Sequence, residues 1–413
     1  MPRQSDKRID PNLIRRHRRD FLKFVAASPL FAKAFEGTIF AQGTPPGDPK
    51  LAFKTAKEVL EVMDFQDLAR QILPPAHWGY MASGVDDNAT RDLNHNAYSH
   101  IELRPRRLVD VSKINYGIEL FGVKYDSPIF LCPVGGHRMF HKDGELASGR
   151  AAVAKNSMQV LSTQTSYSLE DVVKARGGSA PWYQLYMPTK WEDAEKLVKR
   201  VEDAGCPALA WTIDNLAGRN LEWAERFRRT DTRDCMTCHT SANGGRKAAM
   251  LSGLSGPGIN PLAANWDWFD KLRKTTKMKL LLKGVETGED AKMALDRGVD
   301  ALIVSNHGGR ATETLRPTIE TLPEVIESTG NRIPILVDGG IRRGSDAFKA
   351  LAMGARAVGI GRPYVWGLTA FGQDGVERVI DILRAELNLT MRQCGTPTVA
   401  QITHTSVATS RFL

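Results

Sequence analysis

The 413-residue sequence lacks any apolar run long enough to cross a membrane as a helix. Such a helix needs about 20 consecutive apolar residues. The nearest approach, residues 24–35, is short and is interrupted by Pro29 and Lys33. A composition of 42% hydrophobic and 25% charged residues also excludes a disordered, collagen-like or multi-spanning chain. A soluble globular protein is therefore expected.

Acidic residues are too few to balance the basic ones. The sequence has 47 Asp and Glu residues and 56 Lys and Arg residues, which gives a net charge of +9. The first 41 residues hold nine basic and four acidic side chains and so carry five of these net charges. The remaining chain is only mildly basic. Nucleic-acid binding therefore has no support beyond the total charge.

The basic leader contains Arg18-Arg19-Asp20-Phe21-Leu22-Lys23, which has the form of a twin-arginine export signal. With a cleavage point after Ala41, residues 1–41 are predicted to direct the protein to the periplasm or otherwise out of the cytoplasm. This route carries folded proteins, so any cofactor would be loaded before export. The alternative interpretation is a basic amphipathic N-terminal helix.

Cysteine is also scarce, and Cys132, Cys206 and Cys394 stand alone like small apolar residues. The other two belong to Cys235-Met236-Thr237-Cys238-His239, the attachment pattern of c-type haem. Cys235 and Cys238 would bind the vinyl groups and His239 the iron. Met250 is a sixth-ligand candidate by proximity only. A local disulfide, a partial metal site and two free thiols remain alternatives.

From residue 128 onward, short apolar runs alternate with stretches of helical periodicity, which predicts βα units and a parallel sheet. Eight such units favour a (β/α)8 barrel preceded by an N-terminal helical segment, residues 42–127, with a long loop at about 228–262. The expected helices are 145–156, 191–204, 288–297, 318–328 and 345–353. The expected strands are 129–133, 159–162, 182–186, 208–213, 279–283, 301–305, 335–337 and 357–360.

Polar and charged residues follow the strands, where active sites of such barrels lie. After the seventh and eighth strands come two glycine-containing segments, Asp338 to Gly344 and Gly359 to Arg362, each with an arginine. Backbone N–H groups in such segments commonly bind phosphate. Together they predict a phosphorylated ligand.

The motif Ser305-Asn306-His307-Gly308-Gly309-Arg310, supported by Leu282-Lys283-Gly284, Gln184-Leu185-Tyr186 and Leu103-Arg104-Pro105-Arg106, resembles the FMN-dependent 2-hydroxy-acid oxidases and dehydrogenases. The resemblance runs from about Phe65 to the C-terminus. It implies an enzyme that oxidises an L-2-hydroxy acid, lactate-like or larger, and assembles as a homotetramer.

The resemblance also implies residue roles. His307 would remove the substrate proton with Asp214 as its partner, and Arg310 would bind the substrate carboxylate. Tyr80 and Tyr186, and Arg219 beside them, would contact the substrate, while Lys283 would face the flavin. The expected flavin-binding residues are Pro133, Val134, Gly135, Ser162, Gln184, Thr212, Lys283, Ser305, Asp338, Gly340, Arg342, Gly361 and Arg362.

Departures from the family pattern leave the substrate open. Thr163-Gln164 replaces a common Ser-Trp pair, Asn220 stands where many members have a second arginine, and Ala311-Thr312-Glu313 replaces Gln-Leu-Asp. We expect electrons to pass from FMN to a cytochrome or other respiratory acceptor, through haem if it is attached. The alternatives are an oxygen-dependent oxidase, a lactate monooxygenase, or a non-catalytic electron carrier on a barrel scaffold.

Overall fold

The computed structural model describes residues 52–233, 249–256 and 258–409. The chain divides into two units, Met1–Phe53 and Lys54–Leu413. All elements named below belong to the second unit. The predicted leader lies outside the described residues, so its role stays a prediction at this point.

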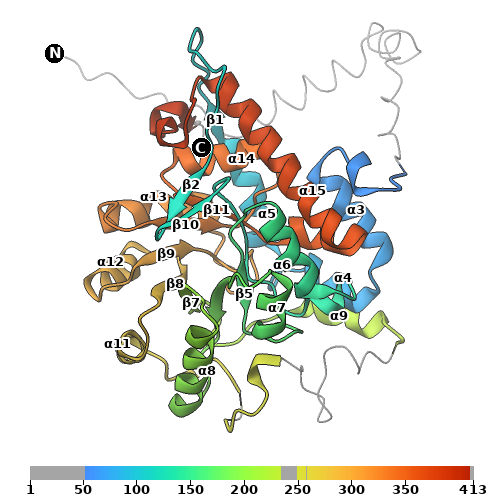
Figure 1. Cartoon of the computed structure of the whole chain (residues 1–413), viewed down its shortest axis with the longest axis vertical. Helices are drawn as coiled ribbons and strands as arrows, with labels where there is room; N and C mark the ends of the chain where they lie inside the picture. Colours follow the sequence, from blue (N-terminus) through green and yellow to red (C-terminus); the bar gives the residue numbers. More distant parts are fainter. Residues whose placement is uncertain (1–51, 234–248, 257, 410–413) are drawn as a thin grey trace, which may run out of the picture. The chain divides into compact units, whose positions relative to one another are not determined.

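Eight parallel strands form the centre of the second unit (Figure 1). Hydrogen-bonded neighbours follow the order β4-β11-β10-β9-β8-β7-β6-β5, and a bridge between Leu131 and Gln159 joins the two ends. The sheet therefore closes into the predicted (β/α)8 barrel, and each expected strand is found. They are β4 (Ile129–Leu131), β5 (Val160–Ser162), β6 (Trp182–Leu185), β7 (Ala208–Thr212), β8 (Lys279–Val285), β9 (Ala301–Val304), β10 (Ile335–Asp338) and β11 (Ala357–Ile360).

Helices surround the barrel, and their apolar faces explain why. In α8, for example, Ala194, Leu197, Val198 and Val201 recur at helical spacing and are buried against the sheet side. The five helices expected from the sequence are all present within a few residues. The barrel helices are α6 (Gly144–Ala154), α7 (Leu169–Ala175), α8 (Trp191–Asp203), α11 (Trp266–Thr275), α12 (Gly288–Asp296), α13 (Thr318–Thr329) and α14 (Gly344–Ala352).

The last barrel helix, α15 (Arg362–Cys394), is 33 residues long and is broken at Phe371 and Gly372. It packs against α3 (Val62–Ile72), as Figure 1 shows, and against α6 and α14. Two more helices, α4 (Pro75–Ala82) and α5 (Ala89–Asn96), lead into the barrel, and α9 (Glu222–Thr230) follows β7 and packs on α4. These contacts bring α4 and α5 to the carboxyl ends of the strands.

Two small antiparallel sheets complete the unit. Strand β1 (Ile101–Leu103) pairs with β12 (Val407–Thr409), and β2 (Ile118–Leu120) pairs with β3 (Val123–Tyr125). Neither was expected from the sequence. Among the described residues, no helix has the length and apolar character needed to cross a membrane.

Candidate active site

A cavity of about 350 Å³ opens at the carboxyl ends of the strands. This is the end of a (β/α)8 barrel where active sites lie. The predicted residues that line it come from α4, from the ends of all eight strands and from the segments that follow them: Tyr80, Pro133, Val134, Gly135, Ser162, Tyr186, Arg219, Lys283, His307, Arg310, Asp338, Gly340, Arg342, Gly361 and Arg362. The folded chain therefore gathers residues that lie up to 282 positions apart, as Tyr80 and Arg362 do.

His307 sits in the turn after β9 with a φ of 60°, in the left-handed region that few residues other than glycine adopt. Gly308 and Gly309 continue the turn with φ values of 65° and 73°. The backbone N–H of His307 donates to the Ser305 hydroxyl at 3.1 Å. This tight turn directs the imidazole into the cavity.

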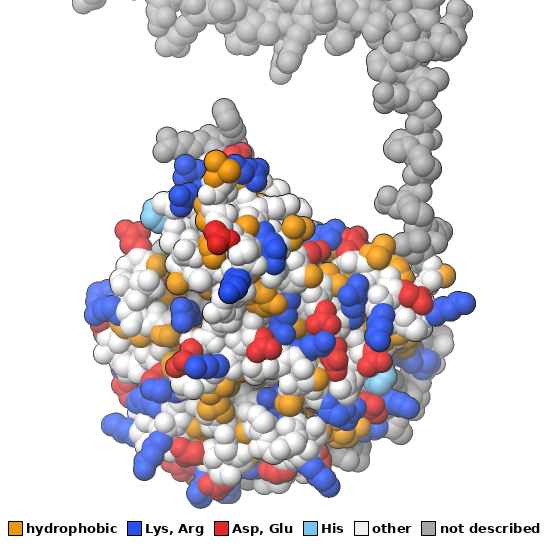
Figure 2. Space-filling model, turned by 45° about the horizontal axis from the view of Figure 1, so that its top comes forward, with side chains coloured by type: hydrophobic (Ala, Val, Ile, Leu, Met, Phe, Trp, Pro, Cys, Tyr) orange, Lys and Arg blue, Asp and Glu red, His pale blue; other side chains and the backbone are white. Residues whose placement is uncertain are grey.

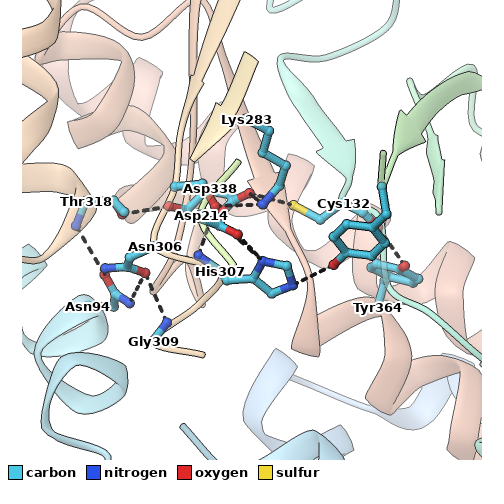
Figure 3. Close-up of polar contacts among 12 residues, drawn as sticks. Asn94, Cys132, Asp214, Lys283, Asn306, His307, Gly309, Thr318, Asp338 and Tyr364 are labelled. Atoms are coloured by element: carbon cyan, nitrogen blue, oxygen red, sulfur yellow. Dashed lines mark hydrogen bonds and ion pairs between the residues drawn. The ribbon is translucent and has the colours of Figure 1, made fainter. Parts of the chain in front are cut away.

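Asp214, just after β7, holds the imidazole from one side. Its Oδ1 lies 2.9 Å from His307 Nδ1 (Figure 3). The close approach depends on Gly284, because a Cβ there would lie 2.6 Å from the Asp214 Cβ. Gly284 has a φ of 104° and lies at an irregularity in the pairing of β8 with β9. The carboxylate thus fixes the proton on Nδ1 and leaves Nε2 as an acceptor.

The charges of this pair are set by burial and by each other. Burial lowers the pKa of His307, and the opposing effect of the Asp214 carboxylate does not restore it. Burial acts to raise the pKa of Asp214, but the charge and hydrogen bond of His307, with help from Lys283, lower it overall. At neutral pH the site therefore holds a neutral imidazole beside an ionised carboxylate. That is the state required of a general base.

Tyr186 lies on the other side of the imidazole. Its hydroxyl is 3.2 Å from His307 Nε2, and the two rings are nearly parallel with centroids 6.4 Å apart. Burial, reinforced by Asp214, raises the pKa of Tyr186 to about 12. The phenol therefore stays protonated and can donate a hydrogen bond at neutral pH.

Arg310 and Tyr80 also line the cavity. The guanidinium carbon of Arg310 lies 4.6 Å from the centre of the Tyr80 ring, so the cation stacks on the aromatic face. One Arg310 nitrogen, Nη1, donates to the backbone oxygen of Ser83 at 2.7 Å. This contact anchors the arginine to the end of α4, and the planar group faces the cavity that His307 enters.

Lys283 at the end of β8 belongs to a buried charged network. Its ammonium donates to the Ser305 hydroxyl at 2.7 Å and lies 3.3 Å from the Asp338 carboxylate (Figure 3). Ser305 in turn donates to Asp338 at 2.7 Å. Burial acts to lower the pKa of Lys283, but Asp338 and Asp214 outweigh it and raise the pKa overall. The site thus holds a permanent positive charge.

The inner part of the cavity suits a planar, phosphorylated cofactor. The Gln184 Nε2 and Thr212 Oγ1 atoms, at the ends of β6 and β7, are buried and have no hydrogen-bond partner within the described residues. A ligand with polar ring edges would supply those partners. Arg342 is buried over the Trp366 ring, at 4.9 Å from its centre, and burial lowers the pKa of Arg342 to about 10. These groups fit flavin mononucleotide.

Arg362 lies at the start of α15, and its guanidinium binds protein carbonyls as well as lining the cavity. Its three nitrogens donate to the backbone oxygens of Met81, Gly308 and Ser83 at 2.8, 2.9 and 3.0 Å. Arg362 therefore ties the end of α4 to the turn that carries His307. A link of this kind could not be inferred from the motif alone.

Four predicted residues lie outside the cavity lining but support it. Ser305 accepts a hydrogen bond from Lys283, and Asp214 binds the imidazole of His307. Gln184 accepts a hydrogen bond from Ser162 at 3.0 Å, and Thr212 is the last residue of β7. Asn220 is exposed, donates to Asp86 at 2.8 Å and does not line the cavity, whereas Arg219 does.

Sequence reasoning missed several lining residues, among them Cys132, Asn215, Ile259 and Asn260. Asn260 arrives from the long loop after β7 because its backbone N–H donates to Met187 O at 2.7 Å. No sequence motif marks the position of Asn260. The backbone contacts of the loop place it, including the bridge between Pro188 and Ile259.

The predicted haem segment, Cys235 to His239, lies outside the described residues. The suggested sixth ligand is wrong: Met250 is 1% exposed, and its sulfur accepts a hydrogen bond from Leu169 N at 3.3 Å. Proximity in the sequence misled the prediction, because an apolar thioether is equally suited to fill a protein core.

Comparison with known proteins places the chain among flavoenzymes. Residues 69–409 match the family model described as FMN-dependent dehydrogenase. A peroxisomal (S)-2-hydroxyacid oxidase of Arabidopsis thaliana is 37% identical, with 85% of this chain and 97% of that protein covered. An L-lactate oxidase of Lysinibacillus sphaericus is 35% identical, with 86% and 95% covered.

Solved structures give the same result. A mandelate oxidase superimposes with a TM-score of 0.75 at 34% identity, covering 83% of this chain and 97% of the other. Flavocytochrome b2 superimposes with a TM-score of 0.76 at 30% identity, covering 87% and 90%. The family description names FMN and no haem, so haem attachment gains no support.

The predicted export through the twin-arginine route is contradicted by these comparisons. Relatives from Arabidopsis thaliana and Oryza sativa that align over 85% of this chain are named as peroxisomal enzymes. The pair Arg18-Arg19 was over-interpreted, because a short basic segment with a few apolar residues arises in many N-terminal sequences that are not export signals.

Proposed function

Because the chain belongs to the family of FMN-dependent 2-hydroxy-acid oxidoreductases, we propose that it oxidises (S)-2-hydroxy acids to 2-oxo acids and passes the electrons to molecular oxygen. In this reaction the substrate loses two electrons and two protons, and oxygen is reduced to hydrogen peroxide. Several relatives are named as oxidases, which favours oxygen over a cytochrome as the acceptor.

The observation that carries the proposal is the imidazole of His307 held between two polar groups. Asp214 lies on Nδ1, and the Tyr186 hydroxyl lies near Nε2. In the proposed reaction Nε2 takes a proton from the substrate, and the ionised Asp214 stabilises the imidazolium that forms. The low pKa of His307 keeps Nε2 free to accept that proton at neutral pH.

The substrate carboxylate is assigned to Arg310, because a planar guanidinium can bind both carboxylate oxygens. The Tyr80 ring stacks on the Arg310 guanidinium, and the Tyr186 hydroxyl would donate a hydrogen bond to the substrate. These contacts would present the α-carbon to His307 in one orientation. Correct placement of this kind accounts for a large part of the rate enhancement in enzymes.

Bound FMN supplies a two-electron acceptor. We assign its ring to the pocket lined by Pro133, Val134, Gly135 and Ser162, with Gln184 and Thr212 next to this lining, and its phosphate to the region of Gly340, Arg342, Gly361 and Arg362. Lys283, fixed by Ser305 and Asp338, would supply a permanent positive charge at the ring edge. Such a charge favours negative charge on the adjacent ligand.

An anaerobic experiment followed by an aerobic one tests the proposal. The purified protein is mixed with (S)-lactate and (S)-2-hydroxybutyrate without oxygen, and loss of the flavin absorbance is followed by stopped flow. Oxygen uptake, hydrogen peroxide and cytochrome c reduction are then measured with air present. We expect rapid loss of flavin absorbance and one peroxide for each 2-oxo acid formed.

Each contrary outcome has a definite meaning. A flavin that no 2-hydroxy acid reduces would refute the activity. Reduction of cytochrome c without oxygen uptake would refute the oxidase assignment, and oxygen uptake without peroxide would point to a monooxygenase. A pyridine haemochrome spectrum of the same sample tests for haem independently.

A further inference from the structure

The outer wall of the cavity, on the side of the long loop after β7, is polar rather than apolar. Gln164, Asn215, Arg219 and Asn260 contribute to it, together with Ile259. A methyl or phenyl substituent on the substrate would have to pack against these groups. Burying amide and guanidinium groups against an apolar substituent is costly unless they find partners.

Two of these groups can donate hydrogen bonds to a ligand. The side-chain amide of Gln164 and the guanidinium of Arg219 line the cavity and make no hydrogen bond or ion pair with any described residue. Arg219 is exposed and Gln164 is half-buried, so water solvates them until a ligand enters. A substrate that displaces this water must supply acceptors for both groups.

The backbone holds this wall in place. Asn260 Nδ2 donates to Asn215 Oδ1 at 3.2 Å, so the loops after β7 and before α11 are joined at the cavity. Thr189 N also donates to Gly258 O at 3.0 Å, and Pro188 pairs with Ile259. Asn260 itself has a φ of 60°. The wall is therefore a built surface and not a set of loose side chains.

The wall is also positively charged. Arg219 lines the same cavity as His307 and Tyr186. Arg310 already serves the first carboxylate in the proposed function. A second cation on the same cavity, with no acidic partner in the described residues, can bind a second anionic group of the ligand.

We propose that the substrate is a 2-hydroxy dicarboxylic acid, whose second carboxylate is bound by Arg219 and by the side-chain amide N–H of Gln164. This inference rests on the proposed function, since it takes the first carboxylate to lie on Arg310. It assigns the specificity of the enzyme to residues of this wall. Mandelate and lactate would be poorer substrates because their substituents satisfy none of these groups.

Binding of the 2-oxo products tests the proposal without turnover. Isothermal titration of the holoenzyme with 2-oxoglutarate and with 2-oxovalerate compares ligands of equal chain length that differ in the second carboxylate. We expect 2-oxoglutarate to bind at least about tenfold more tightly, as a charge-assisted hydrogen bond allows. Steady-state kcat/KM for 2-hydroxyglutarate and 2-hydroxyvalerate should differ in the same direction.

The variant Arg219→Met removes the charge and keeps a long side chain. The ratio of the two affinities should fall about tenfold or more, mainly through weaker binding of 2-oxoglutarate. Arg70→Met is the matched control, because Arg70 is exposed on α3 and makes no hydrogen bond with the described residues. This control should leave the ratio unchanged.

The outcomes separate this inference from the proposed function. Equal affinity for the two oxo acids, or an equal loss for both in Arg219→Met, would overturn the dicarboxylate assignment even if the enzyme oxidises 2-hydroxy acids. If no 2-hydroxy acid reduces the flavin but 2-oxoglutarate binds preferentially through Arg219, the activity fails and the dicarboxylate site stands.

Discussion

The His307–Asp214 pair concentrates the proposed chemistry in two side chains. Nδ1 of the imidazole is committed to the carboxylate at 2.9 Å, so the basicity of Nε2 depends on the negative charge of Asp214. A substitution that removes the charge of Asp214 and keeps the shape of its side chain isolates the contribution of that charge to the rate. The proposed mechanism therefore predicts a large kinetic effect from a small structural change.

For Asp214→Asn we expect the rate of anaerobic flavin reduction to fall by roughly 10²–10⁴-fold, because the imidazolium loses its stabilising charge. Stopped-flow absorbance measures the rate, and the flavin-to-protein ratio checks cofactor loading. Asp203→Asn, an exposed change on α8, is the control. A variant that keeps its flavin and reduces it at the normal rate would contradict the role of Asp214.

Glu286 is a half-buried acid near this pair that no sequence motif identified. Its Oε1 has no hydrogen-bond partner among the residues the structure describes. Burial, reinforced by the charge of Asp214, raises the pKa of Glu286 to about 7. A raised carboxyl pKa means that the ionised form destabilises the folded state, so the penalty is absent below the unfolded value and complete above pH 7.

Glu286→Gln should therefore stabilise the protein at pH 8 and have little effect near pH 4.5. Allowing for the partial exposure of Glu286, we expect a gain of about 1–2 kcal/mol at pH 8. Urea unfolding across this pH range measures the difference. Glu327→Gln on the exposed face of α13 provides a pH-independent reference. A gain that is the same at every pH would exclude the ionisation of Glu286 as its cause.

How far the site could be predicted depends on where each residue comes from. His307 and Arg310 lie in one short motif, so the sequence was sufficient to single them out. Arg362 binds carbonyls from α4 and from the β9 turn, and Asn260 comes from a long loop. Contacts between distant segments leave no local pattern, so the sequence could not predict them.

Among the elements, the strands were predictable because each is a short buried apolar run. In β9, for example, Ala301–Val304 are all buried. Helix α15 was not predicted, since its apolar residues serve several packing surfaces and its course is broken at Phe371 and Gly372. The β1–β12 pairing also escaped prediction, because it joins residues about 300 positions apart.

The two halves of α15 meet at a pair of glycines. A Cβ at Gly375 would lie 1.9 Å from the carbonyl oxygen of Gly367, so neither position can carry a side chain without moving the backbone. Both residues are buried. The first half of α15 starts at Arg362 in the active site, and α15 as a whole packs on α3 and α14. The glycine contact thus connects the site to the outer helices.

Gly375→Ala should destabilise the protein by about 2–4 kcal/mol, because the contact is with backbone that cannot rotate away. Thermal and urea unfolding of the holoenzyme measure the change. Gly258→Ala is the control, since a Cβ there would meet nothing within 4 Å. An equal effect of the two substitutions would show that the contact between the helix halves is unimportant.

At the scale of the whole molecule, the excess positive charge is not gathered into a surface patch on the face shown in Figure 2. Basic and acidic side chains are interspersed there. Five of the nine net charges belong to the first 41 residues. The cationic groups that matter for function are instead buried in the cavity, where Arg342 and Arg362 lie.

These buried cations repel one another. Burial lowers the pKa of Arg362 strongly, and Arg310, Arg342 and Arg91 lower it further, while Asp92 opposes them only in part. Concentrated positive charge in a folded site costs stability unless an anion neutralises it. In the proposed holoenzyme the FMN phosphate would provide that anion. The cofactor should therefore contribute to folding stability as well as to chemistry.

Removing FMN should lower the melting temperature by about 3–4 °C when the holoenzyme is compared at about 100-fold excess of FMN over its Kd. In Arg342→Met the apoprotein should melt no lower than the wild-type apoprotein, because one buried charge is gone, but FMN should stabilise it less. Differential scanning calorimetry with and without FMN measures both effects. If the variant lost apoprotein stability and kept the full FMN effect, Arg342 would be a packing residue and the phosphate would have to be placed elsewhere.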